Sequence, residues 1–191
     1  MTDRFPALDD SELIRQTLDG ERQAFGALVS RYQNRLYSSM LQILRSETDA
    51  EDVVQDAFVL AFTKLSTFKG NSQWYTWLYR IAYNVAINRM RKRRPTVSLD
   101  GPSENQQFDF ADAGPAPDDR LEQQERANQL HLALARLTLE HRSILVLREM
   151  EGLEYESISE ILDLPIGTVR SRLHRARNHL REHLEALMHQ K

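Results

Sequence analysis

The sequence predicts an all-α protein: two small helical domains joined by a flexible, acidic, proline-rich linker, with a helix-turn-helix in the C-terminal domain. Apolar residues recur at helical spacing in both flanks, and the short alternating runs typical of strands are missing. Residues 95–119 hold four of the six prolines, six acidic side chains and no basic one, a composition that buries too little to fold. Positive charge is concentrated in two blocks, although the net charge is −3: residues 57–94 carry eight basic and no acidic side chains, and residues 164–181 carry five arginines and no carboxylate. Two such blocks indicate two separate sites for a polyanion.

These shifts in composition set the expected domain bounds. We expect a first helical domain over residues 8–94, a linker over 95–120 and a second helical domain over 121–187. The chain of 191 residues has no cysteine, which excludes disulfides and thiolate metal sites or nucleophiles. The N-terminus lacks a signal-peptide pattern, and the longest aliphatic run, Ile144–Leu147, is too short to cross a bilayer. We therefore expect a cytoplasmic protein.

A helix is predicted over residues 49–65. Thr48 and Glu51 fit a capping box at its start. The opposite face is most simply interpreted as a solvated surface, because charged helix faces usually meet only water. The expected core residues are Val54, Phe58, Ala61, Phe62 and Leu65, and the opposite face carries Asp52, Gln55, Asp56 and Val59.

A glycine-containing loop, 66–73, and a second helix, 74–93, carry six of the 15 aromatic residues. Phe68, Trp74 and Tyr75 flank a polar stretch with Lys69 and no carboxylate near in sequence. The competing interpretation is that the aromatic residues all belong to the core. Aromatic rings interleaved with cations suit unpaired nucleic acid, because bases stack on the rings while cations match the backbone charge. The predicted inward stripe is Trp77, Leu78, Ile81, Ala82 and Val85, and the predicted polar face is Arg80, Asn84, Asn88 and Arg91.

The C-terminal half reads as a helix-turn-helix. An apolar helix, including Ile144, Leu145, Leu147 and Met150, ends near Gly152. A short helix with Tyr155, Ile158, Ile161 and Leu162 inward is followed by a turn at Asp163–Leu164 and by Pro165 at the first position of the next helix. In that helix Val169, Leu173, Ala176 and Leu180 form a buried stripe, which leaves Thr168, Arg170, Ser171, His174, Arg175 and Asn178 outside. Such a helix enters the major groove, where arginine reads guanine, and Arg172 and Arg177 at its flanks are expected to grip phosphate.

One competing motif is "HLREH", which fits the H-x-x-E-H pattern of a zinc peptidase family. A catalytic zinc needs a third protein ligand and an open position. Only eight residues follow His183, so we expect no metal site and no catalytic residue there.

Both halves together resemble bacterial RNA polymerase sigma factors, specifically the extracytoplasmic-function (ECF) group of the sigma-70 family. "DAEDVVQDAFVLAF" with "STFKGNSQWYTWLYRIAYNVAINRMRKRR" resembles the second sigma region, and "LARLTLEHRSILVLREMEGLEYESISEILDLPIGTVRSRLHRAR" resembles the fourth. The resemblance implies a stress-response transcription-initiation factor that recognises and opens promoter DNA, with no catalytic activity, cofactor or small-molecule substrate. Its implied partners are core RNA polymerase, through the β′ clamp helices and β flap, double-stranded and melted promoter DNA, and an anti-sigma factor that can hold it at the inner membrane face.

The resemblance also implies residue roles. The minus-thirty-five element would be bound by Thr168, Arg170, Ser171, Arg172, His174, Arg175 and Arg177. The minus-ten element would be bound by Phe68, Lys69, Gly70, Asn71, Ser72, Trp74, Arg80, Asn84, Asn88 and Arg91. The face with Asp52, Gln55, Asp56 and Val59 would dock core polymerase instead of facing water. The alternative function is a conventional helix-turn-helix regulator with an N-terminal sensing or dimerisation domain, which would not need the aromatic and basic segment 66–94.

Overall fold

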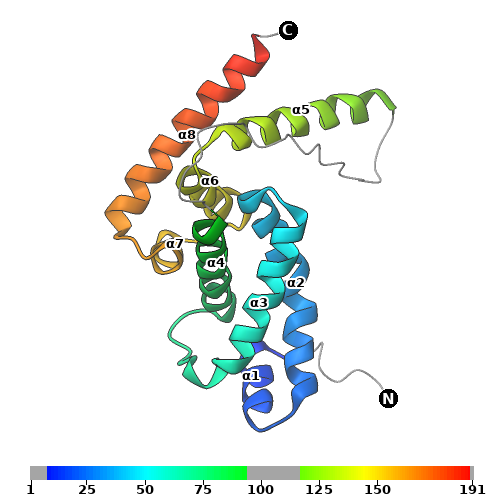
Figure 1. The fold of residues 1–191 in the computed structure, drawn as a ribbon, viewed down its shortest axis with the longest axis vertical. Helices are drawn as coiled ribbons and strands as arrows, with labels where there is room; N and C mark the ends of the chain where they lie inside the picture. The colour runs from blue at the N-terminus through cyan, green and yellow to red at the C-terminus, as the bar shows by residue number, and fades with distance from the viewer. Residues whose placement is uncertain (1–7, 94–116, 190–191) are drawn as a thin grey trace.

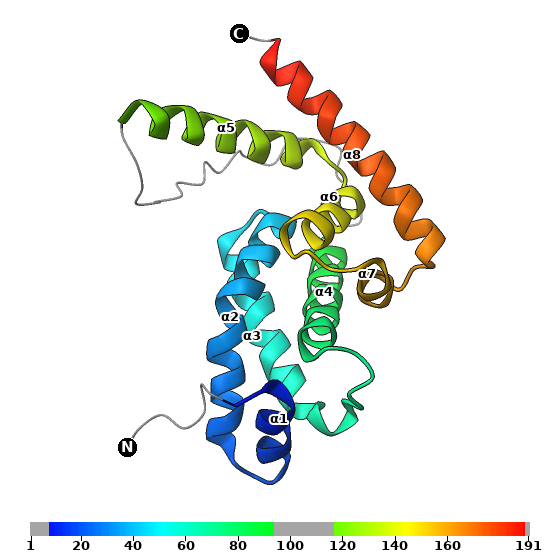
Figure 2. The same ribbon diagram turned by 180° about the vertical axis from the view of Figure 1, so that it is seen from behind.

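The computed structural model describes residues 8–93 and 117–189, and within them it is helical without a strand (Figures 1 and 2). The all-α prediction is therefore confirmed, while most of the predicted linker lies outside the described residues. Helix α5 begins at Pro117, earlier than the predicted domain start at residue 121. The helices are α1 (Asp10–Leu18), α2 (Arg22–Leu44), α3 (Glu47–Thr63), α4 (Trp74–Arg93), α5 (Pro117–Arg136), α6 (Leu139–Leu145), α7 (Tyr155–Leu162) and α8 (Ile166–Met188).

The N-terminal half packs α2, α3 and α4 side by side, with α1 against the N-terminal part of α2 (Figure 2). A 3₁₀ turn, η1 (Leu65–Thr67), leads from α3 into the loop before α4. The core between these helices contains both aromatic and aliphatic side chains, and its aliphatic part includes Leu28, Leu36, Met40, Ile43, Val53 and Leu78. Three long helices that share one apolar seam give the loop before α4 a rigid frame.

Two expectations for α3 were wrong in detail. The helix begins at Glu47, and the hydroxyl of Ser46, not Thr48, accepts the backbone N–H of Asp49 at 3.2 Å. Ser46 has the same kind of hydroxyl acceptor two residues before Thr48, so either residue could have been the N-cap on sequence alone. Phe62 was expected in the core but is 43% exposed, because it packs edge-on against Phe25 with its other side uncovered.

The buried stripe of α4 is also rotated from the predicted one. Leu78 and Ala82 are buried as expected, but Trp77, Ile81 and Val85 are only half-buried. The other buried residues are Trp74, Tyr75, Thr76, Tyr79 and Ala86. The reason is that α4 contacts α2 and α3 on one side and α7 on another, so it buries a wider arc than a helix packed on one side.

The C-terminal half contains the predicted helix-turn-helix, in which α7 and α6 both pack against α8. The turn places Asp163 at a left-handed φ of 53°, and Pro165 precedes the helix as its cap instead of occupying the first helical position. Its carbonyl accepts the backbone N–H of Thr168 at 2.8 Å and of Val169 at 3.0 Å. A π-helical turn, η2 (Val146–Met150), extends α6 and leaves Met150 exposed, whereas Met150 was expected in the apolar stripe.

The two halves share one hydrophobic core, a contact that the sequence did not predict. Glu151, whose side chain is only 5% exposed, accepts from Arg35 Nε at 2.7 Å and from the hydroxyl of Ser39, both on α2. Arg142 of α6 donates to the carbonyl oxygen of Ile43 at 2.9 Å, and burial lowers its pKa to about 10. Charged groups that cross from one half to the other therefore fix how the halves meet.

Candidate nucleic-acid interfaces

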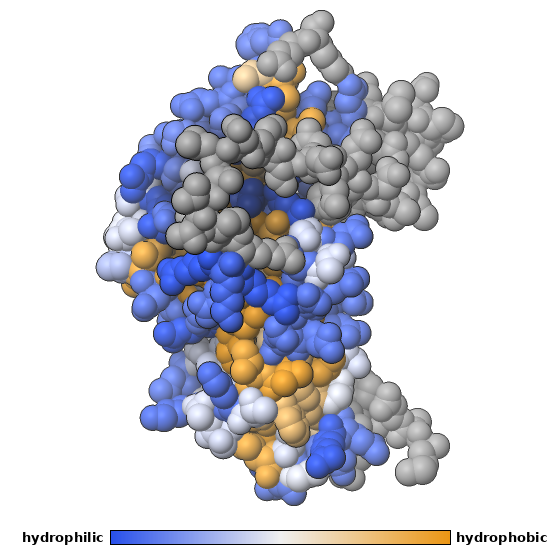
Figure 3. All heavy atoms as spheres, in the orientation of Figure 1, coloured by the Kyte–Doolittle hydropathy of each residue, from blue (hydrophilic) through white to orange (hydrophobic). Residues whose placement is uncertain are grey.

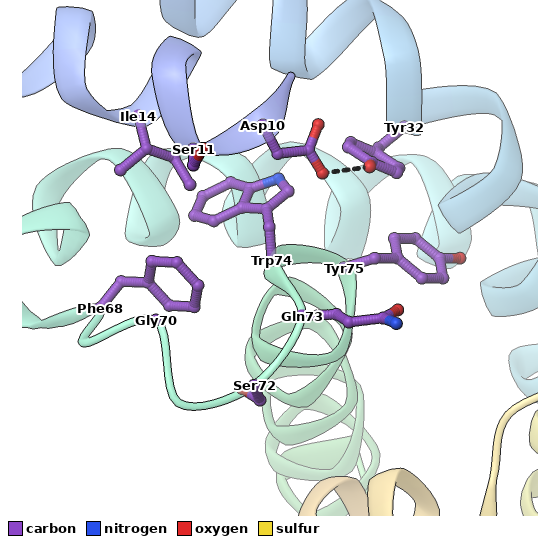
Figure 4. Close-up of a pocket in the computed structure, with 10 residues that line it drawn as sticks. All are labelled: Asp10, Ser11, Ile14, Tyr32, Phe68, Gly70, Ser72, Gln73, Trp74 and Tyr75. Atoms are coloured by element: carbon purple, nitrogen blue, oxygen red, sulfur yellow. Dashed lines mark hydrogen bonds between the residues drawn. The ribbon is translucent and has the colours of Figure 1, made fainter.

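A cavity of about 300 Å³ lies beside the N-terminal end of α4 (Figure 4). Its walls come from α1, α2, the loop between η1 and α4, and the first turn of α4. Gly70 turns the loop at a φ of 71°, a conformation that favours glycine. The lining residues are Asp10, Ser11, Ile14, Tyr32, Phe68, Gly70, Ser72, Gln73, Trp74 and Tyr75.

Aromatic rings form one wall of this cavity. The ring of Phe68 stands edge-on to Trp74 at 5.6 Å between centroids and lies 5.3 Å from Trp77. Trp74 is only 3% exposed, and its indole Nε1 has no hydrogen-bond partner among the described residues. The sequence had favoured Trp77 for the core and Trp74 for the loop edge, whereas Trp74 is the more deeply buried of the two.

The structure brings together part of the predicted loop set. Four predicted residues line the cavity, namely Phe68, Gly70, Ser72 and Trp74. Lys69 and Asn71 are exposed on the same loop but do not line it. A polar and aromatic cavity, with an exposed cation on the same loop, is suited to hold a planar group next to a phosphate backbone.

Sequence reasoning missed the contribution of α1 and α2 to this cavity. The carboxylate of Asp10 accepts from Arg31 Nη1 at 2.5 Å and from the hydroxyl of Tyr32. Burial, with the neighbouring Asp10 carboxylate, raises the pKa of Tyr32 to about 12. No local pattern in α1 marks Asp10 or Ser11 as site residues, because only the packing of α1 beside the loop brings them there.

The predicted polar face of α4 is present as a row. Arg80, Asn84, Asn88 and Arg91 are all exposed, at spacings that align them along one side of the helix. Neither arginine of this row forms an ion pair with another described residue, so both guanidinium groups are available to a ligand.

The outer face of α8 also agrees with the predicted pattern. Val169, Leu173 and Ala176 are buried, while Leu180, also expected inside, is only partly buried. Thr168 is half-buried near the start of the helix, where it would meet the edge of a groove. Four predicted base-reading residues are exposed, namely Arg170, Ser171, His174 and Arg175.

The two flanking arginines of α8 are held by carboxylates. Arg172 lies 3.2 Å from Glu140 of α6, and Arg177 lies 2.6 Å from Glu149 of η2. These cations therefore brace α8 against the preceding helices; Arg177 is also exposed, whereas Arg172 is half-buried. The sequence placed both at the flanks but did not reveal their partners.

The face of α3 that was first interpreted as solvated is exposed and continues into an apolar groove. Asp52 and Asp56 are bound by Arg89 of α4, and Val59 is 58% exposed. Beyond Val59 lies an open hollow of about 450 Å³, and Figure 3 shows apolar side chains gathered over this part of α2 and α3. The groove is lined by Arg22, Phe25, Gly26, Phe58, Val59, Phe62 and Thr63.

The histidines near the C-terminus do not assemble a metal site in the described part of the chain. His179 contacts Glu182 at 3.3 Å and stacks on His141 at 5.1 Å between centroids. No group of three metal-ligating side chains occurs among the described residues. No helix in the described ranges is long and apolar enough to span a membrane.

Comparison with known proteins gives two family matches in the expected order. The family model "Sigma-70 region 2" matches residues 28–96, and "Sigma-70, region 4" matches residues 127–180. The RNA polymerase sigma-H factor of Pseudomonas aeruginosa is 36% identical over 185 residues, covering 94% of this chain and 95% of the relative. The ECF RNA polymerase sigma-E factor of Escherichia coli is 37% identical over 186 residues, covering 95% of this chain and 97% of the relative.

Solved structures agree over both halves. The structure of CnrH in complex with the cytosolic domain of CnrY has a TM-score of 0.66 at 29% identity and covers 93% of this chain and 97% of that chain. The sigma factor RpoE from Bartonella quintana, in complex with the anti-sigma factor NepR, has a TM-score of 0.64 at 26% identity, covering 84% of this chain and 96% of that chain. A conventional helix-turn-helix regulator would not account for the region 2 match. The chain belongs to the extracytoplasmic-function group of the sigma-70 family and is a promoter-specificity factor of bacterial RNA polymerase.

Proposed function

We propose that this factor recognises promoters through two different modes of contact, one with unpaired DNA and one with duplex DNA. The loop cavity and the α4 face would hold the minus-ten element as it opens, and the outer face of α8 would read the minus-thirty-five duplex. The observation that carries the proposal is the aromatic-walled cavity at the start of α4, together with the exposed row of Arg80, Asn84, Asn88 and Arg91 farther along the same helix. A protein that bound only duplex DNA would not need such a cavity.

Energetics support base capture in the cavity. Opening one base step forfeits stacking of about 1.4 kcal/mol. An unpaired base that stacks on a protein ring regains about 1–3 kcal/mol. Phe68 lines the cavity and is only half-buried, so part of its ring is open to a base. Capture of one base therefore offsets the melting of one or two steps.

On α8, Arg170 and Arg175 would donate to guanine edges, while Ser171 and His174 would contact neighbouring bases. Arg172 and Arg177 would contact phosphate and set the helix in register without reading sequence. Thr168 would lie near the DNA backbone. Arg172 is paired with Glu140 and Arg177 with Glu149. These ion pairs would reduce the contribution of the two arginines to DNA affinity.

The α3 face would dock the β′ clamp helices of core polymerase. Asp52, Gln55 and Asp56 supply acceptors for cationic side chains, and Val59 leads into the apolar groove with Phe62. An acidic strip beside an apolar groove suits a helix that carries both cations and apolar side chains. The C-terminal half would meet the β flap.

An anti-sigma factor is a further proposed partner, because the similar sigma factor RpoE from Bartonella quintana was solved in complex with the anti-sigma factor NepR. Since polymerase and chromosome are its targets, the factor would act in the cytoplasm. It would have no catalytic activity of its own.

The test is promoter opening by core polymerase with this factor and with Phe68→Ala. The variant should open duplex promoters less well by about 1–3 kcal/mol, because stacking in the cavity is lost. Fluorescence of 2-aminopurine in the minus-ten strand measures the opening. A template whose minus-ten region is already unpaired is the control, since it needs no melting and should restore most initiation. Normal opening of the duplex by Phe68→Ala would contradict base capture.

A further inference from the structure

Arg89 bridges two helices at the proposed polymerase-docking face. Its guanidinium extends from α4 to α3, where Nη1 donates to Asp52 Oδ2 at 2.6 Å and Nη2 donates to Asp56 Oδ2 at 2.8 Å. The two hydrogen bonds, first to Asp52 and then to Asp56, raise the pKa of Arg89. One planar cation thus holds both acidic side chains of the predicted docking set.

The bridge determines where the two carboxylates point. Asp52 and Asp56 are four residues apart on one helix, and like charges at that spacing repel each other. The rigid fork of a guanidinium offsets this repulsion and fixes both rotamers, which the flexible ammonium of a lysine would do less well. Arg89 occupies only Oδ2 of each carboxylate, and neither Oδ1 has a hydrogen-bond partner among the described residues.

We propose that Arg89 is a positioning residue for polymerase docking, which presents Asp52 and Asp56 as a preset pair of acceptors for N–H donors on the partner. This inference rests on the proposed docking of polymerase on the α3 face. Arg89 itself lies on the side of α4 turned toward α3, away from the row of Asn84 and Asn88, so it acts through the carboxylates and not by touching DNA.

If Arg89 is removed, a pure charge effect and a loss of positioning predict opposite changes in affinity for core polymerase. Removing one positive charge makes the face more acidic, and long-range attraction alone would then tighten binding to a cationic partner. Loss of positioning leaves two carboxylates that must be ordered when the partner binds, which weakens the complex mainly through faster dissociation. The sign of the change in affinity therefore separates the two effects.

The experiment compares full-length Arg89→Met with the unaltered protein for binding to core RNA polymerase at physiological salt. Methionine retains an apolar stem but no donor. We expect the Kd to rise about tenfold, which corresponds to roughly 1.4 kcal/mol, with most of the change in the dissociation rate. Arg89→Lys should recover part of the loss. Lys92→Met removes one charge from the same helix. Lys92 has no carboxylate partner among the described residues, so this control should leave the Kd unchanged.

A double-mutant cycle identifies which idea fails. Asp52→Asn with Asp56→Asn should weaken polymerase binding, and Arg89→Met should then add nothing further. If Arg89→Met binds core polymerase as tightly as the unaltered protein, or more tightly, the positioning role is overturned. If it weakens binding equally in the double-Asn background, the effect is structural and the inference also fails. If the double-Asn variant binds core normally, the docking face itself is wrong.

Discussion

Helices α4 and α8 both expose a row of polar and basic side chains, but they hold their cations differently. On α8, Arg172 and Arg177 are paired with carboxylates of the preceding helices, and the guanidinium of Arg170 lies 5.8 Å from the centre of the Tyr155 ring. On α4, Arg80 and Arg91 form no ion pair with a described residue. The two arginines at the flanks of the α8 surface are therefore braced by carboxylates, whereas the two arginines in the exposed row of α4 are free of ion pairs with described residues.

The difference fits the two kinds of DNA that these helices are proposed to bind. Duplex DNA has a fixed shape, so arginines that are ordered in advance lose little further side-chain entropy when they meet it. A single strand changes its backbone path as it is pulled open, so unrestrained side chains can follow it. Bracing would carry a cost on α8, because each paired carboxylate would also lie near the phosphates of a bound duplex and lower the local positive potential.

The largest effect that would sharpen this comparison is expected at Arg175, which is exposed on α8 without a carboxylate partner among the described residues. Arg175→Ala should cost about 1–3 kcal/mol of promoter binding and relax sequence preference in the minus-thirty-five element. Binding of the holoenzyme to promoters with single base changes measures both. Arg181→Ala removes the same charge farther along the helix, and an equal loss of specificity there would mean that Arg175 does not read a base.

A smaller effect is expected for the free face of α4. Asn84→Ala and Asn88→Ala should each weaken binding of the holoenzyme to a single-stranded minus-ten oligonucleotide by about 0.5–1.5 kcal/mol, the usual contribution of a hydrogen bond. Binding to a minus-thirty-five duplex should not change. Asn34→Ala, at an exposed position of α2, is the matched control. A loss confined to duplex binding would reverse the assignment of the two helices.

Much of this arrangement could be predicted because it depends on local patterns. Val169, Leu173 and Ala176 recur at helical spacing after a proline and a turn, so both the buried and the exposed sides of α8 followed from the sequence. The row on α4 and the loop with Phe68 and Gly70 were predicted for the same reason.

The features that could not be predicted depend on contacts between residues that are far apart in the chain. Glu151 meets Arg35 only because η2 packs on α2, and the packing of α7 on α4 widens the buried arc of α4 beyond the predicted stripe. Phe62 fits the helical period of a core residue, yet only Phe25 of α2 covers one side of its ring, so periodicity alone placed it wrongly. Asp10 joins the loop cavity through the packing of α1, which leaves no trace in the local sequence.

The smallest expected effect tests the braced cations of α8 directly. Arg177 already forms an ion pair with Glu149, so it has less to gain from a phosphate. Arg177→Met should therefore cost no more than about 0.5 kcal/mol of promoter binding, within the range of an exposed ion pair. Glu149→Gln should tighten binding by a similar amount, since it frees Arg177 and removes a negative charge near phosphate. Filter binding of the holoenzyme at several salt concentrations measures both changes.

The salt dependence shows whether the freed arginine reaches the DNA backbone. One added phosphate contact steepens the slope of log affinity against log salt by about 0.9 for duplex DNA. Glu149→Gln should show part of this increase, and Arg177→Met in the same background should abolish it. Glu185→Gln, an exposed carboxylate farther along α8, controls for the change in net charge. If Arg177→Met alone costs as much as Arg175→Ala, the pairing with Glu149 does not restrain Arg177, and the distinction between braced and free cations has no consequence for binding.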